Sequence, residues 1–268
     1  MASLQSQGRG KPVARRTEDP GIASRPPGAT PSQLGRTLGQ PYEFVQRRTY
    51  GEINDLLQRG ELDLAFICSG GYVALPKDAP IEIIALPVVN GKSVYHSLIV
   101  VRDASPIQRF EDLEGLRVAF TDPLSSTGYL YPVFRVAALG KDPRTFFASV
   151  LFSGSHDRSI QAVLRGLVDA AAVNELVYNH LVVPHSEYWA QLRVIETSKD
   201  FGMPPVVAPR SVPAVVRTRM REFLLHLVDT PEGRKRLAAL GVDGFKPGGS
   251  EFYDSVREIR EATRATRR

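Results

Sequence analysis

Residues 116–139 read LRVAFTDPLSSTGYLYPVFRVAAL and join an apolar run, a hydroxyl-rich loop and an amphipathic segment. Residues 118–120 are continuously apolar and few, which predicts a strand covered on both faces. Pro132 is disfavoured inside a helix, so regular helix is expected to begin near Tyr131. The loop between this strand and this helix is where we expect a ligand.

Three hydroxyl side chains lie in this loop, on Ser125, Ser126 and Thr127. The first N–H groups of a helix have no partner within the helix and carry the positive end of its dipole, which favours an anion there. The alternative is that these residues only cap the helix. Both interpretations stay open on this stretch alone.

The charge of the chain is unevenly distributed. The formal charge of the 268 residues is +5, but residues 1–48 hold eight Lys/Arg against three Asp/Glu, and the remainder holds 26 of each sign. A basic nucleic-acid-binding face is therefore not expected on the folded part. The single cysteine, Cys68, excludes an internal disulfide and a multi-cysteine metal site, and we expect neither a metal nor a cofactor.

The N-terminal segment differs in composition from the rest. Residues 1–40 contain five Pro, six Gly and no aromatic residue, which predicts a disordered tail. They lack the apolar core of a secretory signal, so no signal peptide is expected in the chain as written. No apolar run approaches the roughly 18 residues that a membrane span needs.

A helix–glycine–strand pattern occurs twice. Arg-Gly at residues 59–60 and again at 165–166 ends a predicted helix, and an Asp and a buried strand follow each. Strand candidates at 42–46 and 149–154 precede the two helices. Two such units predict an α/β protein with two lobes, each a mostly parallel sheet flanked by helices. Residues 204–213 are too rich in proline for a central strand and predict a crossover.

Four loops are expected to leave the C-terminal ends of strands, where ligands gather in open α/β sheets. They carry small hydroxyls, one imidazole, one aromatic ring and almost no Lys or Arg, which suits an oxyanion held by neutral O–H and N–H donors. His156 would donate to an oxygen; its alternative is a capping or loop histidine. The candidate ligand-binding residues in these loops are Ser69, Tyr72, Ser125, Ser126, Thr127, His156 and Glu175.

An enzyme using the same cleft is a further alternative. Cys68 or Ser126, with His156 and Asp157, has the residue types of nucleophilic catalysis. No nucleophile elbow, P-loop or metal spacing accompanies them. Adjacent His156 and Asp157 would also point in different directions from a helix start. We therefore expect no catalytic residue.

Four stretches, taken in order, are informative: VAFTDPLSSTGYLYP (118–132), FFASVLFSGSHDRSIQAVLRGLVDAAAV (146–173), GMPPVV (202–207) and ALGVDGF (239–245). They resemble the phosphate/phosphite/phosphonate-binding proteins of ABC importers. The resemblance covers roughly residues 42–256 and implies a type II periplasmic-binding-protein-like fold whose lobes close on a phosphoryl group. It implies lobe one at 41–102 and 197–268, and lobe two at 103–196.

The resemblance also assigns partners and a compartment. It implies a periplasmic or extracytoplasmic monomer that binds a small oxyanion (phosphate, phosphite or an alkylphosphonate) and works with an ABC transporter permease. A ligand-sensing module of a regulatory protein remains the alternative. Because the family's export signal and first strand have no evident counterpart in residues 1–40, the first strand is expected to be missing.

By matching motifs, the family's oxygen-binding hydroxyls fall on residues 125–127, its histidine on His156, and its lobe-one tyrosine on Tyr95. The family's other aromatic contact falls on Cys68 or is displaced to Tyr72. Relatives that bind aminoalkylphosphonates carry an acidic residue at one further position. Here that position is Pro204, so an amine-bearing phosphonate is not expected to be preferred, unless Glu175 or Asp200 takes over the role.

Overall fold

The computed structural model describes residues 3–6, 42–182 and 190–265. By internal packing the chain divides into two units. Unit one takes in the residues through Ile67, together with Leu75–Ser93 and Pro204–Gly249; unit two takes in Cys68–Ala74, Val94–Met203 and the residues from Ser250 onward. These packing units differ from the expected lobes, because four segments expected in lobe one pack with the second unit: Cys68–Ala74, residues 94–102 (with Tyr95), residues 197–203 and the C-terminal helix.

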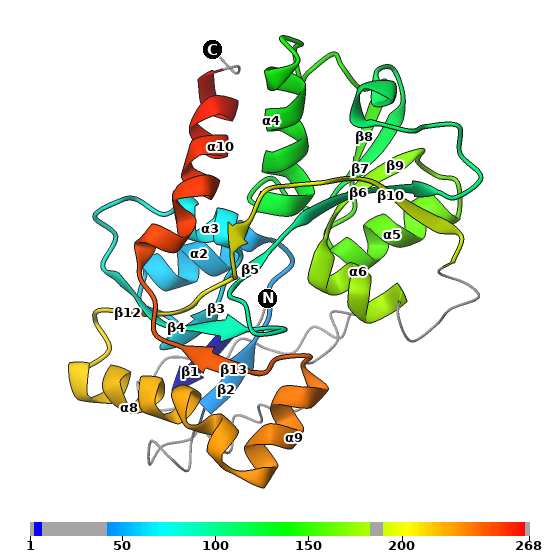
Figure 1. Cartoon of the computed structure of the whole chain (residues 1–268). Coiled ribbons are helices and arrows are strands. Elements are labelled where there is room, and N and C mark those ends of the chain that lie inside the picture. The colour runs from blue at the N-terminus through cyan, green and yellow to red at the C-terminus, as the bar shows by residue number, and fades with distance from the viewer. Residues whose placement is uncertain (1–2, 7–41, 183–189, 266–268) are drawn as a thin grey trace. The chain divides into compact units, whose positions relative to one another are not determined.

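The sheet of unit one has six strands in the order β13-β4-β12-β3-β1-β2 (Figure 1). Every pairing in it is antiparallel, so the expected mostly parallel sheet is wrong for this unit. The reason is that β2 and β3 run in the same direction but are not neighbours, because β1 lies between them. The strands are Ser3–Ser6 (β1), Tyr42–Val45 (β2), Leu64–Phe66 (β3), Ile81–Val88 (β4), Val206–Pro209 (β12) and Gly244–Lys246 (β13).

Strand β1 corrects two expectations about the N-terminus. All of its residues pair with β2, and Ser3 and Leu4 also pair with β3. A strand therefore fills this place in the sheet and satisfies backbone groups of both neighbours, and the expectation of a missing first strand is wrong. Residues 3–6 are likewise not part of a disordered tail. The rest of the predicted tail, residues 1–2 and 7–40, lies outside the described residues.

Strand β12 corrects the crossover predicted for residues 204–213. It lies between β4 and β3, with Val206, Val207 and Ala208 buried. The proline content does not prevent this, because Pro204 and Pro205 precede the strand and Pro209 is its last residue, so the interior of the strand retains its N–H groups.

The described α-helices of unit one are Tyr50–Gln58 (α2), Ala214–Leu225 (α8) and Pro231–Ala239 (α9). Helix α2 starts with the capping box that Thr49 and Glu52 predict, and it buries Ile53, Leu56 and Leu57. Helix α8 packs on β4 and β13. One core cluster of this unit comprises Leu64, Ile84, Val206, Ala208 and Met220.

The main sheet of unit two has five strands in the order β10-β6-β9-β7-β8. Strand β7 pairs in parallel with β8 and β9, whereas β6 pairs antiparallel with β9 and β10, so this sheet is mixed. A separate two-stranded ribbon joins β5 and β11. The strands are Val94–Tyr95 (β5), Ser97–Arg102 (β6), Arg117–Phe120 (β7), Ser149–Phe152 (β8), Ala170–Asn174 (β9), Leu192–Thr197 (β10) and Phe201–Gly202 (β11).

Five α-helices accompany these strands in the described part of unit two, and α10 lies beside α4 (Figure 1). Their bounds are Ser69–Ala74 (α3), Tyr131–Ala138 (α4), His156–Leu164 (α5), Glu175–Val182 (α6) and Asp254–Ala265 (α10). The core between the sheet and α5 includes Val100, Ala119, Ile160, Val163, Ala171 and Val173. Within the described ranges, no helix is long and apolar enough to cross a membrane.

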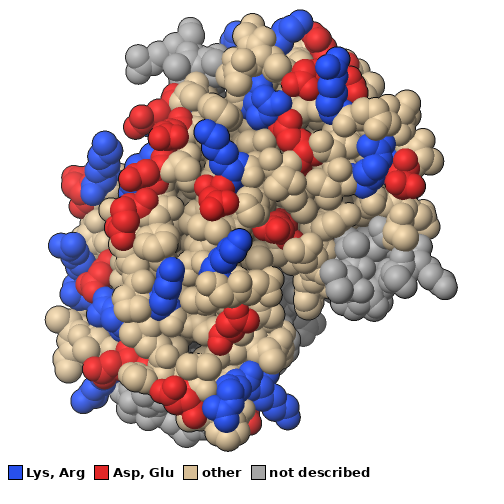
Figure 2. All heavy atoms as spheres, in the orientation of Figure 1, with Lys and Arg blue, Asp and Glu red and all other residues tan. Residues whose placement is uncertain are grey.

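The predicted repeat is confirmed in detail. Arg59 and Arg165 end α2 and α5 with the same backbone angles, φ −79° and ψ −2°. The glycines that follow, Gly60 and Gly166, have φ of 66° and 68°, values that favour glycine because other residues meet a steric penalty there. Figure 2 shows basic and acidic side chains interspersed over one face of the molecule, in line with the balanced charge outside the N-terminal segment.

Candidate functional site

The hydroxyl-rich loop forms a single wide turn before α4. Residues Ser126–Leu130 (η2) are π-helical, and the Leu130 N–H donates to the Ser125 carbonyl at 2.9 Å, five residues back. Regular α-helix begins at Tyr131, as Pro132 predicts. Because π-turns are rare and often occur at functional sites, this irregularity favours a functional role for the loop.

The three hydroxyls of the loop are all fully buried but have different partners. Ser125 Oγ accepts from the Gly128 N–H at 2.9 Å, so the capping interpretation is confirmed for this residue. Ser126 Oγ bonds to Tyr95 OH at 2.7 Å. Thr127 Oγ1 has no hydrogen-bond partner among the described residues, although its carbonyl accepts from Ser97 Oγ at 2.6 Å.

His156, at the start of α5, is buried against the same turn. Its Nδ1 accepts from the Asn174 backbone N–H at 3.1 Å and lies 3.0 Å from Thr121 Oγ1. Burial lowers the pKa of His156 to about 4, so the ring is neutral at pH 7. With Nδ1 accepting, the proton of the neutral ring is on Nε2, which is then a donor.

Ser155 occupies the N-cap position of α5, yet its side chain makes no capping hydrogen bond. Its hydroxyl is buried and, like that of Thr127, has no partner among the residues that the structure describes. Serine is a preferred N-cap residue, whose hydroxyl ordinarily accepts from an N–H of the first turn. The hydroxyl is instead an unused polar group beside His156.

Two glycines allow the segments to approach this closely. A Cβ atom on Gly128 would lie 2.3 Å from Thr121 Oγ1 and 3.0 Å from His156 Cε1. A Cβ atom on Gly70 would lie 2.2 Å from the Leu124 carbonyl oxygen. The contacts of 2.3 Å at Gly128 and 2.2 Å at Gly70 are too short for a Cβ atom, so both positions require glycine.

Tyr95, Ser69 and Ser126 form a second group of hydroxyls. Tyr95 OH lies 3.2 Å from Ser69 Oγ as well as 2.7 Å from Ser126 Oγ, and all three residues are fully buried. Ser69 Oγ donates to the Gly202 carbonyl at 2.6 Å. Cys68 Sγ lies 3.6 Å from Ser126 Oγ. The predicted Tyr95, Ser69 and Ser126 therefore lie together within unit two.

Tyr72 and Glu175 have other partners. The Tyr72 ring packs on that of Tyr253, with centroids 4.7 Å apart. Glu175 Oε2 lies 2.7 Å from Nδ1 of His96, and the other ring nitrogen, Nε2, lies 2.9 Å from Asp200 Oδ1. Burial opposes protonation of His96, but the hydrogen bonds that its ring donates to Glu175 and Asp200 raise its pKa overall.

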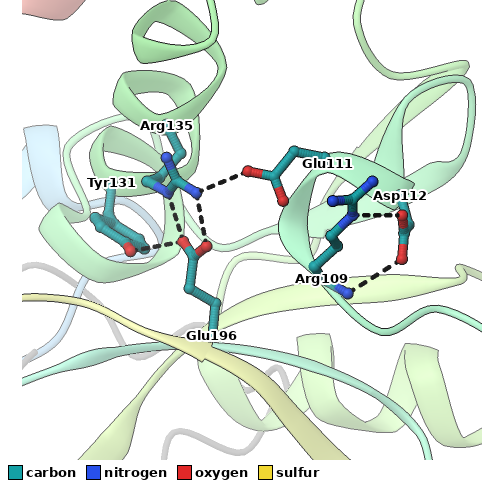
Figure 3. Close-up of polar contacts among 6 residues, drawn as sticks. All are labelled: Arg109, Glu111, Asp112, Tyr131, Arg135 and Glu196. Carbon is teal, nitrogen blue, oxygen red and sulfur yellow. Dashed lines mark hydrogen bonds and ion pairs between the residues drawn. The ribbon is translucent and has the colours of Figure 1, made fainter.

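A partly buried ion-pair network holds α4, which follows the π-turn (Figure 3). Arg135 donates twice to Glu196 of β10, at 2.7 and 2.8 Å, and Tyr131 donates to the same carboxylate at 2.6 Å. Glu111 lies 3.2 Å from Arg135 Nη2. Hydrogen bonding to Glu196 raises the pKa of Arg135. The neighbouring Arg109 is 72% exposed in its pair with Asp112, so that pair contributes less.

Sequence reasoning missed Ser97, Thr121 and His96. Ser97 has a readable signal, since it follows Tyr95 by two residues in a strand region and therefore shares its face. The other two have no local signal, because their partners lie 35 or more residues away. In the part of the chain that the structure describes, no group of three His, Cys, Asp or Glu side chains could hold a metal ion.

The assembled region offers neutral donors. The site loops at residues 68–72, 122–128, 153–157 and 174–175 contain no Lys or Arg. The same loops hold the buried hydroxyls of Thr127 and Ser155, which have no partner among the described residues, and the N–H of the neutral His156 ring. Such an array can bind an acceptor-rich anion by hydrogen bonding, with no formal positive charge from the protein in these loops.

The chain is similar to known binding proteins. The family described as "ABC transporter, phosphonate, periplasmic substrate-binding protein" matches residues 28–253. The phosphate-import protein PhnD of Mycolicibacterium smegmatis is 31% identical over 148 residues, which are 51% of this chain and 46% of that protein. The chain thus spans about half the length of this curated relative.

Solved structures agree on the fold. A binding protein component of an ABC phosphonate transporter from Pseudomonas aeruginosa has a TM-score of 0.81 and 25% identity, covering 88% of this chain and 80% of that one. PhnD1 from Prochlorococcus marinus, solved with methylphosphonate, has a TM-score of 0.75 and 21% identity, covering 86% and 89%. The fold is that of the periplasmic binding proteins, and the chain belongs to the family of periplasmic substrate-binding proteins of phosphonate ABC transporters.

Proposed function

We propose that this chain binds a phosphate-like oxyanion (phosphate, phosphite or an alkylphosphonate) as the solute-binding component of an ABC importer. The observation that carries the proposal is the pair of buried hydroxyls of Thr127 and Ser155, which have no partner among the described residues. Ser155 directly precedes His156, and Thr127 lies in the π-turn against which His156 packs through Gly128. A buried polar group without a partner costs about 1–3 kcal/mol. A ligand that accepts from both hydroxyls would remove this cost.

The donor set suits the oxygens of a phosphoryl group. Its oxygens would accept from Thr127, Ser155 and Nε2 of His156, while Ser126 and Tyr95 contribute the adjacent hydroxyl pair. Because a pKa of about 4 keeps His156 neutral, its role is that of a hydrogen-bond donor at pH 7. Family membership and the name of the mycobacterial relative support the same ligand class.

We propose binding without catalysis. Nδ1 of His156 is occupied by Asn174 and Thr121, so it is not available as a base toward Ser126 or Cys68. Those two side chains bond to each other instead. The expected partner of the loaded protein is a membrane permease, as for other members of an import family.

Isothermal titration with phosphate, phosphite and methylphosphonate tests the proposal, with sulfate as a tetrahedral control. At least one phosphoryl ligand should release heat and raise the melting temperature with mass-action dependence on its concentration. Phosphorus NMR of the mixture should show the ligand unchanged after incubation. A folded protein that gives no heat with any of the three ligands contradicts the proposed function, and ligand turnover contradicts the absence of catalysis.

A further inference from the structure

His96 is bonded at both ring nitrogens to carboxylates. Nδ1 lies 2.7 Å from Glu175 Oε2, and Nε2 lies 2.9 Å from Asp200 Oδ1. The three residues come from separate segments of unit two: the junction of β5 and β6, the start of α6, and the residue before β11. A ring that bonds to a carboxylate at each nitrogen donates from both, which describes an imidazolium.

This cluster lies directly beside the candidate site in the chain. Tyr95, the neighbour of His96, contributes its hydroxyl to the Ser126 pair. Asn174, the neighbour of Glu175, donates its N–H to His156. The backbones are also joined, because the Glu175 N–H donates to the His96 carbonyl at 3.0 Å. A charge on Glu175 is therefore part of the electrostatic environment of the site.

Two carboxylates at this place would attract a positively charged substituent of a ligand. The two carboxylates already pair with His96. The raised pKa of His96 indicates that these contacts outweigh the burial of its ring. A ligand ammonium would have to displace the imidazolium or lie against it, and both are unfavourable.

We propose that His96 is a specificity-determining residue: it occupies, as a built-in cation, the place between Glu175 and Asp200 that an ammonium substituent of the ligand would take. The site consequently selects phosphoryl ligands that lack an amine. This inference rests on the proposed function, since it concerns the substituent of the same phosphoryl ligand.

The role of His96 in ligand selection can be tested without disrupting the fold. If the ring is removed, Glu175 Oε2 still accepts from the His96 backbone N–H at 3.2 Å and keeps its orientation. The Asp200 side chain is 69% exposed and remains solvated. Neither carboxylate becomes a buried unpaired charge, so His96→Ala should fold and leave both carboxylates available.

The test is isothermal titration of the full chain with methylphosphonate and 2-aminoethylphosphonate. The wild type should bind methylphosphonate more tightly. His96→Ala should shift the affinity ratio toward the aminoethyl ligand by about tenfold, the scale of a charge-assisted hydrogen bond regained. His96→Ala combined with Glu175→Gln should lose most of this shift. His226→Ala removes an exposed histidine–carboxylate pair, to Asp229 at 2.7 Å, and should leave the ratio unchanged.

The outcomes separate the two proposals. Absence of binding of any phosphoryl ligand to the wild type would contradict the proposed function itself. If the wild type binds methylphosphonate but His96→Ala keeps the ratio, or loses both ligands, the role of His96 in selection is wrong. A wild type that prefers the aminoethyl ligand overturns it as well. Should His96→Ala fail to melt cooperatively, His96→Gln, which removes the charge and retains a donor, serves for the same comparison.

Discussion

His156 and His96 lie in the same unit and have opposite surroundings. His156 is enclosed by backbone N–H and hydroxyl groups, and its burial lowers its pKa to about 4. His96 lies between two carboxylates, which raise its pKa. The comparison shows that neighbouring groups decide whether an imidazole acts as a neutral donor or as a cation. One candidate site can thus use one histidine to bind an oxyanion and the other to exclude an amine.

The largest expected effect comes from closing the space around His156. In Gly128→Ala the new Cβ must displace Thr121 or the His156 ring. We expect a loss of about 1–3 kcal/mol in the free energy of unfolding, as for other overpacked sites, and loss of measurable oxyanion binding. Chemical denaturation and titration measure both quantities.

Gly51→Ala is the matched control for this substitution. Its nearest atom is 4.0 Å away and it lies in α2, where alanine is the better helix former. It should therefore leave stability unchanged or raise it. Equal stabilities for wild type and Gly128→Ala would contradict the close packing described around His156.

Thr127→Val tests the unpartnered hydroxyl while keeping the shape of the side chain. Because Thr127 Oγ1 is buried without a partner among the described residues, the unliganded protein should gain up to about 1 kcal/mol of stability. Binding of the preferred oxyanion should weaken by roughly 10- to 100-fold, since a donor to a charged acceptor is lost. Ser126→Ala, which breaks the 2.7 Å bond to Tyr95, should instead lower the stability of the free protein.

The pH dependence of stability should have opposite signs at the two histidines. The stabilisation from His96, whose pKa is raised, is complete below its unfolded pKa of about 6.5 and is lost as pH rises through the folded pKa. The pKa of His156 is lowered from 6.5 to about 4, so its stabilisation is complete above 6.5 and is lost as pH falls toward 4.

Melting temperatures of wild type, His96→Gln and His156→Gln across pH measure these contributions. The difference between wild type and His96→Gln should shrink with rising pH, and that between wild type and His156→Gln should grow between about pH 4 and 6.5. NMR titration of the two imidazoles provides an independent check. If the two melting-temperature differences changed in the same direction with pH, the proposed contrast between the environments of His96 and His156 would be wrong.

The smallest expected effect lies outside the two histidines, at the support of α4. In Tyr131→Phe the Glu196 carboxylate keeps both bonds from Arg135, so only about 0.5–1.5 kcal/mol of stability should be lost. Oxyanion affinity should change less than in Thr127→Val. Arg109→Ala, which removes an exposed pair, should stay within about 0.5 kcal/mol of wild type. A larger binding loss in Tyr131→Phe would show that α4 sets the geometry of the π-turn more directly than we infer.

Much of the local structure could be predicted from the sequence, and the sequence motifs were sufficient to recognise the family. The capping box at Thr49 and Glu52, the helix start at Tyr131 and the paired Arg-Gly helix ends all depend on residues a few positions apart. Each of these features is stabilised by contacts within a single turn, so the residue types at neighbouring positions are enough to predict it. The hydroxyl-rich loop was predicted for the same reason.

Tertiary structure alone decided the direction of strand pairing and which side chains are hydrogen-bonded or charged. Strand β1 lies between β2 and β3, and β12 takes a central place, because pairing partners are chosen across long sequence separations. Likewise, Ser125 caps a turn, while the buried hydroxyl of Thr127, two residues further on, has no partner among the residues that the structure describes. His96 meets Asp200 from 104 residues away, and no local pattern specifies such a contact. The sequence therefore determined which donors are available, and folding determined which of them remain unpaired and which carry charge.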